Sequence, residues 1–337
     1  MALTNHSPHI LVTGATGAVG PRVVASLVEA GCRIRTISLD SPPPGPWPAS
    51  IETQVGDITD DSVVRGAMRG IDAVIHLAAL LHIVNPHPDL QPEYERVNVG
   101  GTAIVVEAAR QAGVERMVFF STIAVYGGSA GGILTEDSPP RPHSFYAQTK
   151  LASERIVLAA KRADGRPLGT VLRLGAVYGA RIKGDYRRLL LALARGRFAP
   201  IGPGTNRRTL VYDGDVARGA LLAVRHPDAA GRIFNVTDGQ FHTMNGIIKT
   251  LCNALGRRPP RLALPVGPVR CLTGVLEDCA RSCGLQSPIV RAMVDKYTED
   301  VAVDGQRFRR QIGFVPQYDL TAGWRETVAE MRQAGDL

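Results

Sequence analysis

A tyrosine and a lysine four residues apart are the side chains in this sequence best suited to acid–base chemistry. Tyr146 and Lys150 lie in a segment that reads as a helix, and a spacing of four places both on one helix face. A free phenol has a pKa of about 10 and carries protons poorly at neutral pH. A nearby ammonium favours the phenolate and lowers that pKa. The hydroxyl of Thr122 could hold a substrate oxygen between them.

A pair at this spacing also occurs on solvent-exposed helix faces, so the segment before it matters. Residues 117–120 form a short, continuous apolar run after a helical pattern, which is typical of a buried parallel strand. Thr122 follows at the end of this run. A loop rich in Gly and Pro then leads to the helix that begins near Tyr146. The sequence therefore predicts a strand and a helix that present the three side chains together.

A second pattern lies near the start of the chain. Residues 9–12 predict a strand, glycines follow at positions 14, 17 and 20, and residues 20–30 predict a helix that leads to a second strand over 33–39. Glycines at these positions let the backbone turn tightly and approach a pyrophosphate, whose charge then lies at the helix N-terminus. Because the turn stands between the first strand and the first helix, a dinucleotide site is the favoured interpretation.

The rest of the chain alternates between short apolar runs and helical patterns. Further strands are predicted at 51–55, 73–77, 171–174 and 233–236, with helices at 98–112 and 185–196 and a mostly helical region from 244. This order predicts an α/β fold, a Rossmann-type doubly wound parallel sheet with a smaller, mainly helical C-terminal substrate domain. We assign residues 1–175 and about 212–243 to the dinucleotide-binding domain, and about 176–211 and 244–337 to the substrate domain. Residues 41–50 predict an exposed loop.

Composition excludes several classes of function. The chain has 337 residues and a net charge of +8, but its basic residues are dispersed and only 5% of residues are aromatic, which argues against nucleic-acid binding. No signal peptide or long apolar run is evident, so we expect a cytoplasmic protein without a membrane partner. The basic helix at 185–196 could lie on a membrane, but a solvated face is the favoured interpretation. The five irregularly spaced cysteines are expected to be buried free thiols, and no metal site is predicted.

Taken together, these segments resemble the extended short-chain dehydrogenase/reductase family, the NAD-dependent epimerase/dehydratase group. The matching segments extend over almost the whole chain: TGATGAVG at 13–20, GDITD at 56–60, HLAA at 76–79, VNVGGT at 97–102, FFSTIAVYG at 119–127, YAQTK at 146–150, LRLGAVYG at 172–179 and RRTLVYDGDVA at 207–217.

The resemblance implies roles for particular residues. Tyr146 would be the general acid/base, Lys150 would hold the nicotinamide ribose, and Thr122 would bind the reacting oxygen. Arg208 corresponds to an arginine that pairs with the diphosphate of a nucleotide-sugar; the alternative is a surface arginine. The cofactor would contact Gly14, Thr16, Gly17, Ala18, Val19 and Gly20 at its pyrophosphate, Asp57 and Ile58 at its adenine, and Leu77, Ala78, Ala79, Asn98, Tyr146 and Lys150 on the nicotinamide side. Asp57 could instead cap a helix, and His76 is expected to be structural.

The sequence departs from the family pattern at several positions. Family 4,6-dehydratases carry an acidic pair where this chain has Ile123 and Ala124, so a dehydratase is disfavoured. Ala176 and Leu81 replace residues that some epimerases use for substrate. Ser38 stands where NAD-preferring members have an Asp, so the sequence favours NAD only slightly over NADP.

The favoured function is an NAD(P)-dependent nucleotide-sugar epimerase, acting at C4 through a keto-sugar that is reduced again. Alternatives are a nucleotide-keto-sugar reductase and a 3β-hydroxysteroid-type dehydrogenase, the latter because residues 297–300 somewhat resemble such enzymes. A dinucleotide-sensing regulatory protein is a further alternative, which the presence of both Tyr146 and Lys150 disfavours. The resemblance also implies a homodimer formed through helices at 98–113 and 146–162, with a UDP-sugar or another nucleotide-sugar as substrate.

Overall fold

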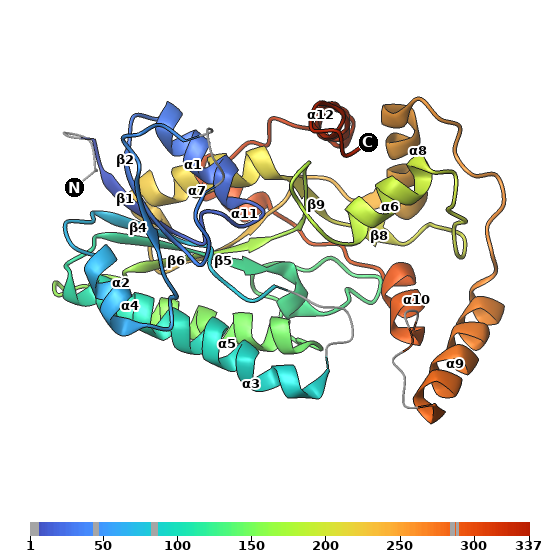
Figure 1. Ribbon diagram of the computed structural model, residues 1–337, viewed down its shortest axis with the longest axis horizontal. Coiled ribbons are helices and arrows are strands. Elements are labelled where there is room, and N and C mark those ends of the chain that lie inside the picture. Colours follow the sequence, from blue (N-terminus) through green and yellow to red (C-terminus); the bar gives the residue numbers. More distant parts are fainter. Residues whose placement is uncertain (1–6, 43–46, 82–86, 284–286, 288–289) are drawn as a thin grey trace.

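A seven-stranded parallel sheet forms the centre of the protein (Figure 1). The computed structural model describes residues 7–42, 47–81, 87–283, 287 and 290–337. In the order β10-β6-β5-β4-β1-β2-β3, the strands are Ile233–Val236, Gly169–Leu174, Arg116–Thr122, Ala73–His76, His9–Thr13, Arg33–Ser38 and Glu52–Val55. The chain winds outward from β1 in both directions, so the topological switch point lies between β1 and β4, where α/β proteins bind ligands. The predicted Rossmann-type fold is confirmed.

Helices cover both faces of the sheet (Figure 1). One face carries α1 (Gly20–Glu29), α7 (Asp213–Arg225) and α11 (Gln306–Ile312), and the other carries α2 (Asp61–Ala67), α4 (Gly101–Gln111) and α5 (Phe145–Ala159). Successive strand residues point to opposite faces, so Val12 packs in the core beneath α1 while Leu11 packs in the core with α4. This double burial explains why the central strands are uninterrupted apolar runs.

The smaller region has its own apolar core, built around Trp324. Its helices include α6 (Asp185–Ala194), α8 (Met244–Leu255) and α12 (Leu320–Gln333), while α9 (Val266–Ser282) and α10 (Arg291–Thr298) stand at the edge of the molecule (Figure 1). Two small ladders pair β7 (Ala176–Tyr178) with β9 (Leu210–Tyr212), and β8 (Arg207–Arg208) with β11 (His242–Thr243). The chain then returns to the sheet, where Phe308 of α11 packs on Phe234 of β10. The division into two domains stays a proposal.

Short helical turns complete the connections. The helix predicted over 98–112 begins earlier, with a 3₁₀ turn at Pro88–Leu90, then α3 (Gln91–Tyr94) and a π-helical segment over Glu95–Gly100 that leads into α4. A 3₁₀ turn at Ile123–Tyr126 follows β5, and another lies at Pro227–Ala229. The predicted loop at 41–50 lies partly outside the described residues.

The expectation of buried thiols is wrong for most of the cysteines. Cys252 is buried and Cys32 is half-buried, whereas Cys271, Cys279 and Cys283 are exposed on or directly after α9. The helix that carries them is buried only around Thr273 and Gly274, a fact that the apolar character of its sequence does not indicate. None of the helices described is both long and apolar enough to span a bilayer.

Candidate active site

The glycine turn after β1 is sterically dependent on glycine. Gly14 has a φ of +70°, and a Cβ atom there would lie 2.8 Å from the Cα of Ala78. A Cβ at Gly20 would lie 2.2 Å from the carbonyl oxygen of Ala15. Gly14 therefore lets the turn lie against Ala78 in the segment that follows β4, and Gly20 lets α1 begin directly on the turn.

Hydrogen bonds hold this turn at the carboxyl ends of the strands. The amide of Gly14 donates to the carbonyl of Ile37 at 2.8 Å, and the amide of Thr16 donates to the Ser38 hydroxyl at 3.2 Å. The N-cap residue of α1, Val19, has no side chain that could accept from the first helical turn. Amides of that turn can therefore serve an anion, so the chain fits a dinucleotide pyrophosphate at this position.

The residues assigned to adenine lie after β3. Asp57 is half-exposed and accepts from the amide of Thr59 at 2.9 Å. The helix cap is Asp60 rather than Asp57, because the carboxylate of Asp60 accepts from the amides of Ser62 and Val63 at the start of α2. Ile58 is buried against Gly101. Because Asp60 caps α2, the carboxylate of Asp57 is not needed there. It lies 3.8 Å from Arg96 and is 38% exposed, so a ligand can reach it.

A chain of hydrogen bonds runs from the glycine turn through His76. The Ala78 amide donates to the Thr13 hydroxyl at 3.2 Å, Thr13 contacts His76 Nδ1 at 2.6 Å, and His76 Nε2 contacts the Thr102 hydroxyl at 3.0 Å. Thr102 donates to the carbonyl of Asn98, so His76 Nε2 must be the donor to Thr102 and Nδ1 the acceptor from Thr13. Burial lowers the pKa of His76 to about 3, so the ring is neutral. The expected structural role is consistent with this position.

Asn98 extends this series of hydrogen bonds to α5, the helix that carries Tyr146. Its amide accepts from the Leu80 N–H at 2.7 Å and donates to the Leu80 carbonyl and to the Thr149 hydroxyl. Thr149 in turn donates to the carbonyl of Tyr146 at 3.0 Å. Asn98 thus positions both the loop after β4 and the first turn of α5. The π-helical segment around Asn98 accompanies this placement, and π-turns are common at functional sites.

Tyr146 lies in the first turn of α5. The helix is capped by Ser144, whose hydroxyl accepts from the amide of Ala147 at 3.2 Å. Burial raises the pKa of Tyr146 to about 12, and the nearby phenol of Tyr94 acts in the same direction. The direction is opposite to the lowering expected from Lys150. The phenol is therefore protonated at neutral pH.

Lys150 explains why the expected effect on the phenol is wrong here. Its side chain is buried, and its Nζ lies 3.9 Å from the ring centre of Phe119 in β5. Burial lowers the pKa of Lys150 to about 7, while the carboxylate of Glu154 partly opposes the shift. At pH 7 the side chain of Lys150 is therefore about half protonated, which reduces the positive charge available to stabilise a phenolate.

Thr122 ends β5, as predicted. It is half-buried, and its hydroxyl oxygen accepts from the amide of Ala124 at 3.1 Å. The hydroxyl hydrogen can therefore donate to a ligand oxygen. Helix α5, which carries Tyr146 and Lys150, lies along β5 (Figure 1), so one strand and one helix present the three predicted side chains.

A buried ion pair beside Lys150 was missed from the sequence. Arg173 of β6 donates to both carboxylate oxygens of Glu154, with a shortest distance of 2.6 Å, and the Ser121 hydroxyl also donates to Glu154. Both charged side chains are at most 3% exposed. The position of Glu154 four residues after Lys150 indicates a shared helix face, but only the fold shows that Arg173 meets it.

Arg208 lies at the predicted substrate side, in β8. Its guanidinium donates to the carbonyls of Lys296 and Tyr297 at the end of α10. Its buried Nε has no hydrogen-bond partner within the described residues, while the hydroxyl of Tyr297 lies against the backbone of Ile201. Because unpaired buried donors are costly, the Arg208 Nε is suited to a polar ligand.

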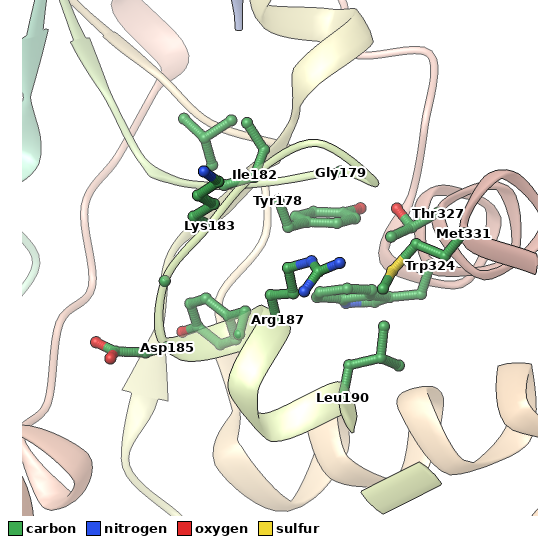
Figure 2. A pocket seen from close by; sticks show the side chains of 13 residues that line it. Tyr178, Gly179, Ile182, Lys183, Asp185, Arg187, Leu190, Trp324, Thr327 and Met331 are labelled. Atoms are coloured by element: carbon green, nitrogen blue, oxygen red, sulfur yellow. The ribbon is translucent and has the colours of Figure 1, made fainter. Parts of the chain in front are cut away.

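The residues that line a pocket in the smaller region (Figure 2) include none of these side chains. Tyr178 and Trp324 stack within it at 4.4 Å between ring centres, and Arg187 extends beside them. Its volume of about 40 Å³ holds a few water molecules at most. We assign it to the packing of β7, α6 and α12 rather than to catalysis.

Comparison with known proteins gives consistent matches. Residues 10–237 match the description "NAD dependent epimerase/dehydratase family". A UDP-glucose 4-epimerase of Streptomyces lividans is 33% identical over 76% of this chain and 83% of its own length. A dTDP-glucose 4,6-dehydratase of Streptomyces griseus is 32% identical over 95% of this chain and 93% of its own. The structure of MoeE5 in complex with UDP-glucose and NAD has a TM-score of 0.75 and 30% identity, covering 97% of this chain and 99% of MoeE5.

Proposed function

The chain belongs to the NAD-dependent epimerase/dehydratase family, and on that premise we propose that it is an NAD-dependent enzyme that epimerises a nucleotide-sugar at C4. The observation that carries the proposal is the continuous set of hydrogen bonds from the glycine turn, through His76 and Asn98, to the turn of α5 that bears Tyr146. This set supports the proposal because it connects the turn that would hold the cofactor with the residue that would exchange the proton.

The chain's own residues would divide the chemistry among them. Thr122 would donate its hydroxyl hydrogen to the reacting oxygen, and Tyr146 would exchange the proton with that oxygen. Lys150 would bind the nicotinamide ribose. NAD, when bound, supplies the acceptor and later the donor of the hydride, together with a positive charge that favours the phenolate.

Arg208 supports a substrate that carries a diphosphate. Its buried Nε is unpaired within the described residues. Guanidinium groups pair well with phosphate oxygens. MoeE5 has been solved with UDP-glucose, and the Streptomyces lividans relative is a UDP-glucose 4-epimerase. These likenesses favour a UDP-sugar.

Water elimination is disfavoured by the residues after Thr122. Ile123 is buried and Ala124 is exposed in the 3₁₀ turn that follows β5. Neither side chain can donate or accept a proton, so this turn offers no second acid–base group for a dehydratase.

The test is to incubate the purified protein and NAD with pairs of UDP-sugars that differ only at C4, and to follow interconversion by chromatography. We expect conversion in both directions with no net change in reduced cofactor. Net oxidation of NADH by a keto-sugar would instead show a reductase, and net reduction of NAD by a 3β-hydroxysteroid would show a dehydrogenase. Tight NAD binding without turnover of any substrate would favour a sensor protein.

A further inference from the structure

Exposed apolar side chains are concentrated in one segment of the smaller region. Of the twelve large apolar side chains that are exposed in the described part of the chain, five lie between residues 262 and 276: Leu262, Leu264, Leu272, Val275 and Leu276. Leu262 is 83% exposed and Leu272 is 61% exposed. Single exposed apolar residues are ordinary, but a cluster of this kind marks a surface that binds something.

Helix α9 presents its apolar residues away from the protein. Its buried residues are Thr273 and Gly274, and Gly274 lies against the guanidinium of Arg291 in α10. Pro268, Leu272, Val275, Leu276 and Cys279 recur at helical spacing on the exposed side. In Figure 1, α9 stands at the edge of the molecule, outside α10, and the segment that joins it to α8 runs along the same edge. The apolar stripe is therefore turned outward.

The same segment is basic. Residues 256–276 contain four arginines and no acidic residue. Arg270 is paired with Asp295 of α10, whereas Arg257, Arg258 and Arg261 are exposed in the connection that precedes α9. An exposed apolar helix face preceded in the sequence by exposed arginines has the composition of an element that lies in a membrane interface.

We propose that residues 257–276 dock the protein on an anionic lipid bilayer surface, with Leu272, Val275 and Leu276 entering the interface and Arg257, Arg258 and Arg261 facing lipid phosphates. Two copies of this chain are a poorer fit, because the segment would place arginines against arginines, and the carboxylates that follow it in α9, Glu277 and Asp278, are already paired with Arg281 and Arg291. The helix would lie on the bilayer, since it is too short and insufficiently apolar to cross it. This departs from the sequence-based expectation of no membrane partner.

The proposal is independent of the reaction that the enzyme catalyses, so it can be tested on the full chain without substrate. We would measure co-sedimentation with vesicles of phosphatidylcholine plus phosphatidylglycerol, and with vesicles of phosphatidylcholine alone. We expect binding to the anionic vesicles that weakens as salt increases, and little binding to the neutral ones. Equal binding to both, or binding to neither, would overturn the proposal.

Variants separate the contribution of the arginines to vesicle binding from that of the apolar side chains. Arg257→Gln/Arg258→Gln/Arg261→Gln should weaken partitioning by about fivefold per arginine, on the order of 100-fold in all, and Leu272→Ser/Leu276→Ser should abolish it. A matched control is Val315→Ser/Arg309→Gln/Arg310→Gln, which changes exposed residues of the same kinds near α11 and should bind as the parent does. Sedimentation velocity without lipid tests the alternative that a second copy of the chain binds the exposed face of α9. If the parent protein is a dimer and Leu272→Ser/Leu276→Ser makes it a monomer, the proposal is overturned.

Discussion

At the scale of residues, burial holds the site in a state of low charge. The pKa of Tyr146 is raised to about 12 and that of Lys150 is lowered to about 7, in both cases chiefly because the charged form is buried. His76 is neutral for the same reason. A site with little fixed charge is sensitive to charge that a ligand brings, because low-dielectric surroundings screen it weakly.

Tyr146→Phe should remove the proton exchange and leave the rest of the site in place. We expect turnover to fall by about 10²- to 10⁴-fold, with NAD affinity changed by no more than a small factor. Initial rates and titration calorimetry measure the two quantities. Tyr318→Phe, which alters a phenol packed on Tyr212, is the control. Activity of Tyr146→Phe equal to that of Tyr318→Phe would contradict the role of Tyr146.

Lys150→Met should stabilise the free protein while impairing catalysis. Because burial lowers the pKa of Lys150 from 10.5 to about 7, the unfolded chain binds this proton more tightly, and stability rises with pH between those two values. Below the folded pKa of about 7 the cost of burying the ammonium approaches its full value, which is at most about 5 kcal/mol. Urea unfolding should show the variant more stable at neutral pH, with the difference shrinking towards pH 10. No gain at neutral pH would refute this.

At the scale of elements, the site is held by a turn, a loop and a helix end that share hydrogen bonds. The glycine turn meets the segment after β4 at Ala78, and Asn98 joins that segment to α5 through Leu80 and Thr149. The connection is buried, so each missing partner would leave an unpaired polar group. The geometry of the site therefore depends on residues that need not touch a ligand.

Gly20→Ala should damage the cofactor side. The added Cβ would lie 2.2 Å from the backbone of Ala15, so the turn must shift, and we expect NAD affinity to fall by more than tenfold. Gly66→Ala is the matched control, because it lies in α2 with no atom within 4 Å of the new Cβ and should stabilise by about 0.5–1 kcal/mol. Fluorescence titration with NADH compares the two variants. Equal affinities would contradict a role of this turn in binding.

Asn98→Leu should destabilise the protein and loosen the site. The N–H and C=O groups of Leu80 and the hydroxyl of Thr149 lose partners, at about 1–3 kcal/mol for a buried group left unpaired. We expect a loss of at least about 2 kcal/mol in urea unfolding. Asn253→Leu, at an exposed position of α8, should change stability by less than about 0.5 kcal/mol. Similar losses in both variants would show that the network is unimportant.

At the scale of the whole molecule, two surfaces remain for partners. One is the exposed segment around α9. The other is the outer side of α5, next to an open depression lined by Phe145, Gln148 and Ala152, among others. Gln148, Ala152, Arg155 and Ala159 recur there at helical spacing, and this is the surface from which we predict a homodimer.

Ala152→Arg should separate such a dimer. A large charged side chain in the middle of this face cannot be accommodated between two packed helices, and its burial would be costly. We expect sedimentation velocity to give a dimer for the parent and a monomer for the variant. Asn253→Arg, at an exposed position of α8, is the control and should remain dimeric. A parent protein that sediments as a monomer would disprove the prediction.

The sequence by itself determined the sheet, the glycine turn and the positions of Thr122, Tyr146 and Lys150 on their elements. These depend on local patterns: period, glycine spacing and the four-residue repeat of a helix. Where patterns were short the prediction failed: the two-residue strand β11 was missed, and the helix predicted from residue 98 begins earlier, with the π-helical segment Glu95–Gly100. Periodicity carries little information over so few residues.

Only the tertiary structure decided which charges and which apolar residues are buried. The pKa of Tyr146 rises rather than falls, Glu154 forms an ion pair with Arg173, and the apolar residues of α9 face outward. Each result depends on segments distant in sequence, because desolvation and pairing are set by what the fold places around a group. The sequence supplied the chemical groups, and packing set the charge and exposure of each.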